Sequence, residues 1–418
     1  MSVKILFFLF FIIPCLTSAQ EAQKINQSNL DSLRAAYMAK QKKAAIEKRA
    51  RFRKQLRDAD KDTINDLDYS HMFYEALPEL SGFHHLKSIN LSNNRLAKVN
   101  LITLESDSLQ RINLSNNVIR KIKFNRCEQV RSVSLNKNEL KRIPRSLRKC
   151  RSLKYLDVSN NHIKRIPRWL VKMDSLNELD LNFNRIKLNN KAAVRMKNIN
   201  TLLLAGNQLK ELPGNIGEMT GVRKFNFSKN SISSVPPSFK KLDSLTNLIF
   251  YKNSFKEIPG EVTYLKNLVE LDFYYNKIRE IPQGIGRLTN LKQLFLSFND
   301  IKTLPDTLAA LKNLKYMYIH HNELTIAPQW ITTLTRLQRL DLGFNRIVSI
   351  PDMSAMENLT EIDLQHNELE RFPWELLDKK NLRILIFRDN PFALTDQQEK
   401  ILQRLENNPD PSHPVVIY

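Results

Sequence analysis

Glycine and cysteine are both scarce in this chain of 418 residues, which contains 9 Gly and 3 Cys. The low glycine content excludes a collagen-like chain and a chain dominated by flexible linkers. The low cysteine content excludes a small domain held together by a disulfide framework. The fold must therefore be stabilised by burial of apolar side chains, and leucine and isoleucine are spread evenly along the sequence.

Motifs of common catalytic sites are absent from the sequence as well. There is no Gly-rich phosphate-binding loop, no His-Glu-x-x-His and no Gly-x-Ser-x-Gly. We therefore expect neither enzymatic activity nor a cofactor.

The sequence has one long apolar run, and it stands at the N-terminus. Lys4 precedes residues 5–16, which are too few to span a bilayer comfortably, and small residues up to Ala19 follow. This pattern predicts a signal peptide over residues 1–19 and a secreted, periplasmic or cell-surface chain without a transmembrane segment. A lipid anchor at Cys15 is the alternative, which Pro14 immediately before it disfavours.

Positive charge is in excess: 65 Lys and Arg stand against 43 Asp and Glu, a formal net charge of +22. Such a charge favours acidic partners, including anionic headgroups, polyanionic glycans and acidic proteins. Because we expect export, nucleic acid is the least favoured of these partners, and we predict none.

The pattern Leu-x-x-Leu-x-Leu-x-x-Asn-x-Leu recurs along most of the chain. One copy uses Leu268, Leu271, Phe273, Asn276 and Ile278. Of the thirteen steps between successive asparagines, eleven are 23 residues long, which chance does not produce. The recurring asparagines are Asn94, Asn117, Asn138, Asn161, Asn184, Asn207, Asn230, Asn253, Asn276, Asn299, Asn322, Asn345, Asn367 and Asn390.

Over residues 64–392 this pattern resembles the leucine-rich-repeat family, in particular repeats of Ras-pathway scaffolds and of bacterial secreted proteins. The resemblance implies an α/β horseshoe solenoid. Its parallel sheet would line the concave face, with an irregular or short-helical convex face and a cap at each end. The expected segments are a signal peptide at 1–19, a basic helical arm at 20–61, a degenerate capping repeat at 62–82, about 14 repeats at 83–392, and a capping helix and tail at 393–418.

The asparagine of each repeat has a structural explanation. Its side chain carries both a donor and an acceptor, so at a chain turn it can satisfy backbone groups that the turn leaves unpaired. We therefore expect the asparagines to form a ladder inside the array. A proline follows six residues later in most copies, as Pro282 follows Asn276, and ends the strand so that the return limb begins.

Both ends of the array carry sequences suited to capping. Met72 stands where an asparagine is expected, 22 residues before Asn94. Thr395 and Gln398 form a capping-box pattern for a C-terminal helix. The apolar stripe of that helix would consist of Ile401, Leu402 and Leu405.

Cys127 and Cys150 occupy the same core position in adjacent repeats, where other repeats have leucine. Two buried free thiols are the simpler interpretation. A disulfide between neighbouring repeats is the alternative in an exported protein.

The predicted concave positions change character along the array. In the N-terminal half they are small and polar, as in Ser88, Asn90 and Ser92, whereas in the C-terminal half many are aromatic. Aromatic residues concentrate at binding hot spots, so we predict a partner-binding surface there; the alternative is that the rings only pack on one another. The predicted residues, with carboxylates at the border, are Ile249, Tyr251, Glu270, Asp272, Tyr274, Phe295, Tyr316, Tyr318, His320 and Asp341.

Basic residues follow the asparagine in the early repeats and predict a positive lateral edge. Residues 117–172 hold 17 Lys or Arg against 3 acidic residues. The edge is either a solvated surface or a polyanion contact that weakens with salt. The candidate polyanion-binding residues are Arg120, Lys121, Lys141, Arg142, Lys164 and Arg165.

A second basic segment precedes the array, where residues 34–57 hold ten Lys or Arg and one Glu. It is either a solvated helix that frays from the N-terminal cap or an arm that docks on an anionic surface.

Histidines do not predict a metal site. His320 and His321 are adjacent, but His366 lies two repeats further on, about 10 Å away at 4.8 Å per strand. That separation is long for one zinc ion, so we expect no metal.

Two functional hypotheses follow. The first is an exported, non-enzymatic scaffold that binds a protein ligand on the aromatic concave surface. The second is a structural protein that associates with an anionic envelope surface or glycan through the basic arm and edge.

Overall fold

The computed structural model describes residues 27–101, 104, 106–190, 196, 198–407 and 414–417. The predicted signal peptide, with Cys15 and the cleavage position near Ala19, lies outside these residues. Most of the proline-containing tail after residue 407 also lies outside them.

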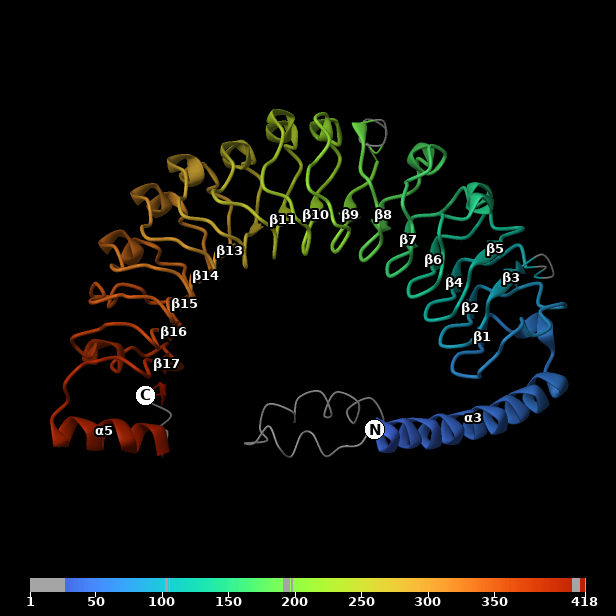
Figure 1. The fold of residues 1–418 in the computed structure, drawn as a ribbon, viewed down its shortest axis with the longest axis horizontal. Helices are drawn as coiled ribbons and strands as arrows, with labels where there is room; N and C mark the ends of the chain where they lie inside the picture. The colour runs from blue at the N-terminus through green and yellow to red at the C-terminus, as the bar shows by residue number, and fades with distance from the viewer. Residues whose placement is uncertain are drawn as a thin grey trace.

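Within the described residues, sixteen short parallel strands form one sheet along the inner side of an open arc (Figure 1). Neighbouring strands pair in register, so Leu271 lies between Leu248 and Leu294. The central residue of each three-residue strand is buried, whereas the residues on either side face the concave surface, as Glu270 and Asp272 do. The predicted α/β solenoid with a concave parallel sheet is confirmed.

The strands of the sheet, in order, are β1 (Asp66–Asp68), β2 (Ser88–Asn90), β4 (Arg111–Asn113), β6 (Ser132–Ser134), β7 (Tyr155–Asp157), β8 (Glu178–Asp180), β9 (Thr201–Leu203), β10 (Lys224–Asn226), β11 (Asn247–Ile249), β12 (Glu270–Asp272), β13 (Gln293–Phe295), β14 (Tyr316–Tyr318), β15 (Arg339–Asp341), β16 (Glu361–Asp363), β17 (Ile384–Ile386) and β18 (Val415–Ile417).

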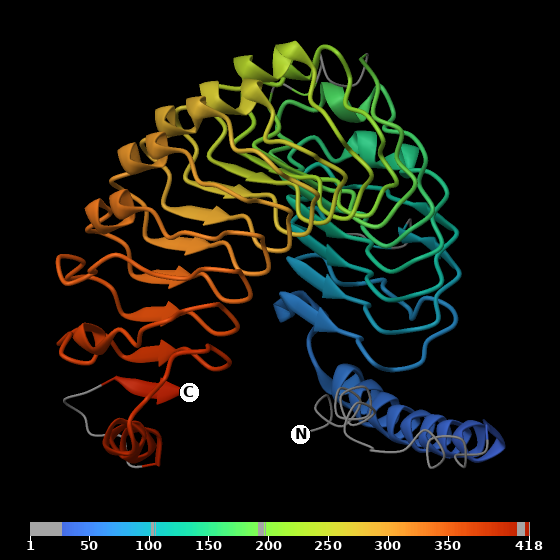
Figure 2. The same ribbon diagram turned by 60° about the vertical axis from the view of Figure 1, so that its left-hand side comes forward.

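Short 3₁₀ helices lie along the outer rim of most repeats (Figure 2). In the repeat of η9 (Gln283–Arg287), Pro282 ends the extended limb, and its carbonyl accepts a hydrogen bond from Ile285 N at 3.0 Å. The turn directs Ile285 into the core, where it is fully buried. The others are η2 (Lys61–Thr63), η4 (Arg145–Lys149), η5 (Leu170–Lys172), η6 (Ile216–Glu218), η7 (Pro237–Lys241), η8 (Gly260–Tyr264), η10 (Asp306–Ala310), η11 (Gln329–Thr333) and η12 (Trp374–Leu376).

The recurring asparagines form the expected ladder. Asn299 Nδ2 donates to Leu296 O in its own turn at 2.8 Å and to Phe273 O in the preceding repeat at 3.0 Å. Its Oδ1 accepts from Ile278 N of the preceding repeat at 2.9 Å. Each asparagine therefore satisfies buried backbone groups in two repeats and joins them. The first member, Asn94, binds Met72 N at 3.1 Å, so the degenerate first repeat joins the same ladder.

Cys127 and Cys150 are joined by a disulfide between two adjacent repeats, and both are buried. Their Cα atoms are 4.6 Å apart, a separation that a disulfide can span. The interpretation as two free thiols is therefore wrong, because the repeat period places the two side chains side by side in the core.

A second, smaller sheet was not expected from the sequence. β3 (Lys98–Asn100) and β5 (Lys121–Lys123) pair in parallel, outside β2 and β4 in the arc (Figure 1). They occupy the limb that later repeats use to approach the proline. Val99 and Ile122 point into the core from these strands, and the residues around them are exposed.

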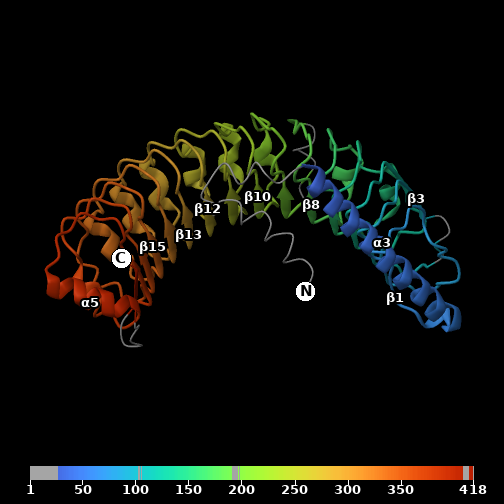
Figure 3. The ribbon, with the colours of Figure 1, turned by 60° about the horizontal axis from the view of Figure 1, so that its bottom comes forward.

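Helix α3 (Gln27–Asp58) lies across the N-terminal end of the array (Figure 3). Its last turns pack on the first repeat: the ring of Phe52 meets Tyr69 edge-on at 5.1 Å, and Lys48 Nζ donates to a backbone carbonyl there at 2.9 Å. Ala45 is buried, whereas the preceding Tyr37 is exposed. The helix therefore packs on the cap from about Ala45 onward, while its first half forms an exposed basic arm.

The C-terminal end is closed by α5 (Asp396–Asn407) and by β18, which adds to β17. The predicted capping box is confirmed, because Thr395 N donates to Gln398 Oε1 at 3.0 Å and Gln398 N donates to Thr395 Oγ1 at 3.4 Å. Leu402 is buried, but Ile401 is exposed, so its assignment to the apolar stripe is wrong.

The asparagine ladder yields a stability prediction. Asn299→Ala leaves two buried carbonyls with one partner fewer and the buried Ile278 N–H without its acceptor, so we expect a loss of about 2–4 kcal/mol. Urea unfolding followed by circular dichroism measures it. Asn290→Ala is the matched control, because Asn290 is exposed and donates a single hydrogen bond, to Lys266 O at 3.0 Å. Equal losses in the two variants would contradict the structural role given to the ladder.

A candidate binding surface on the concave face

The structure brings the ten predicted partner-binding residues together on five neighbouring repeats. Ile249, Asp272, Phe295, Tyr318 and Asp341 form one row, each at the third position of its strand, from β11 to β15. Glu270 and Tyr316 stand at the first strand position, and Tyr251, Tyr274 and His320 follow two residues after their strands. Nine of the ten are partly exposed, whereas Asp341, which stands beside Tyr318 at the end of the row, is buried.

The concave surface formed by these ten residues and their immediate neighbours is called the floor. Rings from neighbouring strands stack on it. The ring centroids of Phe295 and Tyr318 are 5.0 Å apart, with planes inclined by 5°. Tyr251 and Tyr274 stack at 5.7 Å. The rings therefore do pack across strands, as the alternative interpretation expected. They stay partly exposed as well, so packing among the rings and contact with a partner are compatible.

Beside the floor, five rings form a continuous stack that we call the aromatic ladder. Its members are Tyr275, Phe298, His321, Phe344 and His366, with successive centroids 4.1, 3.9, 4.0 and 4.1 Å apart. Each has a positive φ, which the turn before the asparagine imposes. Because each inner ring is covered on both faces by its neighbours, only the edges of the inner rings are left for contact with solvent or a partner. Each of the five rings stands immediately before the recurring asparagine of its repeat, so the repeat period places them in one row.

The histidines join this packing and do not form a metal cluster in the described part of the chain. Phe344 is inserted between His321 and His366, so the two imidazoles cannot share an ion. The Nδ1 atoms of His320 and His321 are 2.8 Å apart, so one imidazole donates a hydrogen bond to the other. Burial lowers the pKa of His320 to about 4, so its ring is neutral near pH 7.

Two carboxylates of the floor are unusual because they are held away from water. Burial, reinforced by Glu270, raises the pKa of Asp272 to about 7. Burial, reinforced by Asp363 on the next strand, raises the pKa of Asp341 to about 7. Each accepts a hydrogen bond from the backbone N–H two residues later, which holds the carboxylate in place.

Ser297 is a polar group of the floor that the sequence did not single out. It stands between Tyr274 and His320 in the row that follows the strands, and those two rings meet at 5.6 Å. Its side chain is fully buried, and its hydroxyl has no hydrogen-bond partner. The floor therefore contains a buried hydroxyl group, that of Ser297, whose hydrogen-bonding capacity is not used within the described residues.

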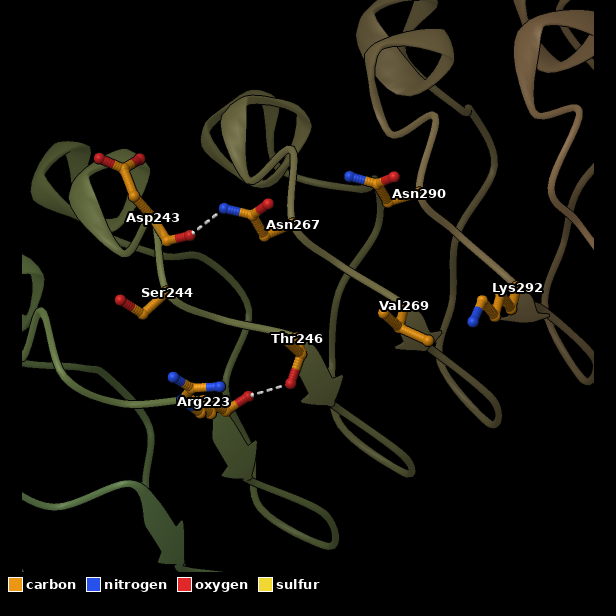
Figure 4. A pocket seen from close by; sticks show the side chains of 8 residues that line it. All are labelled: Arg223, Asp243, Ser244, Thr246, Asn267, Val269, Asn290 and Lys292. Carbon is orange, nitrogen blue, oxygen red and sulfur yellow. Dashed lines mark hydrogen bonds between the residues drawn. The ribbon is translucent and has the colours of Figure 1, made fainter.

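A groove on the flank of the array lies elsewhere and has a structural explanation. Its polar lining comes from consecutive repeats, with Asn267 donating to Asp243 O at 2.7 Å and Thr246 Oγ1 donating to Arg223 O at 3.0 Å (Figure 4). Similar bonds from Asn290 and Asn313 to the preceding repeat continue the pattern. This second asparagine ladder closes the outer flank and leaves the concave face as the better candidate site.

The family model described as leucine rich repeat matches residues 128–186, 243–301, 266–324 and 290–347. The same unit, with its asparagine bonds, continues through the rest of the array. The chain is a leucine-rich-repeat protein. Its sequence has no significant match among curated proteins.

Solved structures with the same architecture include other leucine-rich-repeat proteins. One from Leptospira interrogans is 23% identical, with 87% of this chain and 98% of that chain covered and a TM-score of 0.73. An internalin from Listeria monocytogenes is 20% identical, with 74% of this chain and 82% of that chain covered and a TM-score of 0.58. The plant peptide hormone receptor RGFR1, solved in complex with RGF2, is 25% identical, with 79% of this chain and 56% of that chain covered and a TM-score of 0.60.

The predicted basic edge of this leucine-rich-repeat protein is contiguous and exposed. Its six candidate residues lie on three consecutive repeats, in two side-by-side rows. Arg120 pairs with Glu139 at 2.6 Å. No helix in the described part of the chain combines the length and the apolar character needed to cross a membrane.

The buried carboxylates yield a pH prediction. The pKa of Asp341 is raised from 3.8 to about 7 in the folded chain, so the folded state binds a proton more tightly than the unfolded state. Stability therefore falls as pH rises through this interval, by at most about 4 kcal/mol. Asp341→Asn abolishes this loss, so it should raise the thermal midpoint at pH 8 and change it little at pH 4.

Differential scanning calorimetry from pH 4 to pH 8 measures this effect. Asp306→Asn, at an exposed carboxylate on the convex helix η10, is the control and should not alter the pH dependence. A midpoint difference between Asp341→Asn and the parent chain that stays constant over this range would contradict the assigned pKa.

Proposed function

We propose that this leucine-rich-repeat protein is an exported, non-enzymatic scaffold that binds a partner protein on its concave surface. The observation that carries the proposal is the continuous, partly exposed aromatic surface over strands β11–β16, formed by the floor and the aromatic ladder. The N-terminal sequence, with its short apolar run after Lys4, supports export.

The rings are not required by the fold. In the N-terminal half, the positions equivalent to Tyr251 and Tyr274 are held by Ser92 and Ser115, and strands β2 and β4 pair there in the same register. Repeats with small polar residues at these positions therefore form the same strand pairing as repeats with rings. Exposed aromatic side chains bring a large apolar contact area together with a polar group, which suits protein recognition.

Stacking prepares these rings for binding. Because Tyr275, Phe298 and Phe344 are already fixed by their neighbours, a partner that contacts them immobilises few additional side chains. The cost of ordering on association is thereby reduced. Tyr274 also connects the floor with the aromatic ladder, because its ring lies 4.8 Å from Tyr275 of the ladder and 5.6 Å from His320 of the floor.

The charges on the floor favour a partner with basic groups. Glu270 is partly exposed among the rings, and a basic group of the partner would favour the ionised form of the neighbouring Asp272, whereas the nearby cation Arg339 is paired with Glu361 at 2.7 Å. A lysine or arginine of the partner would find carboxylates beside aromatic faces, a favourable arrangement for both charge pairing and cation–π contact. The structurally similar receptor RGFR1 was solved in complex with RGF2, which supports ligand binding by an array of this shape.

The test removes three rings of the floor. Tyr251→Ala, Tyr274→Ala and Tyr318→Ala together should abolish capture of the partner from the native surface or extracellular fraction, with little dependence on salt. Pull-down with the purified chain, followed by quantification of the captured protein, measures the effect. The matched control is Tyr264→Ala, which removes an exposed ring from the convex helix η8.

The competing hypothesis, association with an anionic envelope surface through the arm, predicts the opposite result. Capture would survive the three tyrosine changes and be lost when the exposed part of the arm is removed. Only residues before Ala45 should be deleted, since Phe52 and the later turns of α3 cover Tyr69 at the end of the core. That pair of outcomes would overturn the proposed function.

A further inference from the structure

Cations form two exposed rows on the edge of the early repeats, which we call the basic strip. One row holds Arg120, Lys141 and Lys164, and the other holds Lys98, Lys121, Arg142 and Arg165. Lys98 and Lys121 lie directly opposite each other in the β3–β5 sheet. Successive repeats are at least about 4.8 Å apart, so the strip presents a cation pair at nearly every repeat over roughly 15 Å or more.

Most of these charges are not compensated within the chain. Arg120 pairs with Glu139, and both side chains are well exposed. None of the other six has a carboxylate within 4.0 Å among the described residues. Like charges on paired strands repel each other, so these uncompensated cations lower the stability of the folded chain.

The later repeats show that the fold does not require this charge. In the same two rows, Lys256, Arg279 and Lys302 stand beside Glu257, Glu280 and Thr303. Arg279 also lies 4.0 Å from Asp300, and Lys302 lies 3.6 Å from Glu323. The rows are thus neutralised in one half of the array and strongly positive in the other, on the same backbone.

Further cations widen the strip without adding rings. Lys123 on β5 is exposed, and the adjoining helix η4 carries the exposed Arg145, Arg148 and Lys149. Within residues 117–172 the rings of Tyr155 and Trp169 are only partly exposed, and neither stands in the two rows, so the strip itself offers no stacking platform for nucleic-acid bases. It offers little apolar surface for insertion into a bilayer either. The chemistry that fits is a flexible chain carrying regularly spaced anionic groups.

From this arrangement we infer that the basic strip binds a linear anionic polysaccharide, one that carries carboxylate, sulfate or phosphate groups along its length. The polysaccharide would run along the rows, with its anionic groups spaced to meet cations of successive repeats. This site lies on the outer limb of the N-terminal repeats and is separate from the aromatic concave surface of the C-terminal half. The inference does not depend on the proposed protein partner.

Fluorescently labelled heparin serves as the probe, and its binding to the full chain is followed by fluorescence anisotropy. Reversal of three charges in the strip, Lys121→Glu, Arg142→Glu and Arg165→Glu, should weaken binding at least about tenfold and reduce its salt dependence. The matched control, Lys256→Glu, Arg279→Glu and Lys302→Glu, changes the net charge equally but lies in the neutralised half of the rows. It should weaken binding less than about twofold.

Both triple variants keep α3, so the charge of the arm is common to them, and circular dichroism establishes that each is folded. Equal losses in the two variants, or no loss in either, overturn the inference. A second experiment measures binding to vesicles of phosphatidylglycerol. If vesicle binding depended on the strip and heparin binding did not, the ligand would be a membrane surface, and this result would also overturn the inference. The tyrosine variants of the concave floor should bind heparin normally, which separates this test from that of the proposed function.

Discussion

The amide side chain at the turn of each repeat is the interaction on which the rest of the structure depends. Its Nδ2 group binds carbonyls of two successive turns, and its Oδ1 atom accepts a backbone N–H from the repeat before, as at Asn276. Without these bonds, three backbone groups per turn would be buried without sufficient partners. The bonds fix the position of each repeat relative to its neighbour, and the parallel strands follow in register.

Because the turn and the buried leucines fix the backbone, side chains in the exposed rows are free to differ from repeat to repeat. The early repeats use this freedom for uncompensated cations on the outer limb, while the later repeats use it for rings and carboxylates on the inner face. Tyr318 and Asp157 occupy equivalent positions in their strands, yet one adds a stacked ring to the floor and the other a hydrogen-bonded carboxylate. Binding properties can thus change along the arc while the fold does not.

The sequence was sufficient wherever one residue recurs at a fixed interval, as Asn299 does, because the contact between two repeats is then the same at every step of the array. It was also sufficient for Met72 and for the Thr395 capping box. It failed where a feature occurs at one place in the array and does not recur: the disulfide between Cys127 and Cys150, the burial of Asp341, and the pairing of Lys98 with Lys121. The anchoring of α3 by Phe52 was missed for the same reason, since its partner Tyr69 belongs to another segment. Each of these contacts forms only when the segments have packed against each other in the folded array.

The central claim is that the inner face of the later repeats is the surface that a protein partner touches. A photo-crosslinking amino acid placed at Tyr274 tests it most directly, with the same group at Tyr264 on the convex side for comparison. Irradiation in the native surface or extracellular fraction should link one dominant protein through position 274 and nothing above background through position 264. Crosslinks of equal yield at both positions, or a dominant product at position 264, would contradict the account.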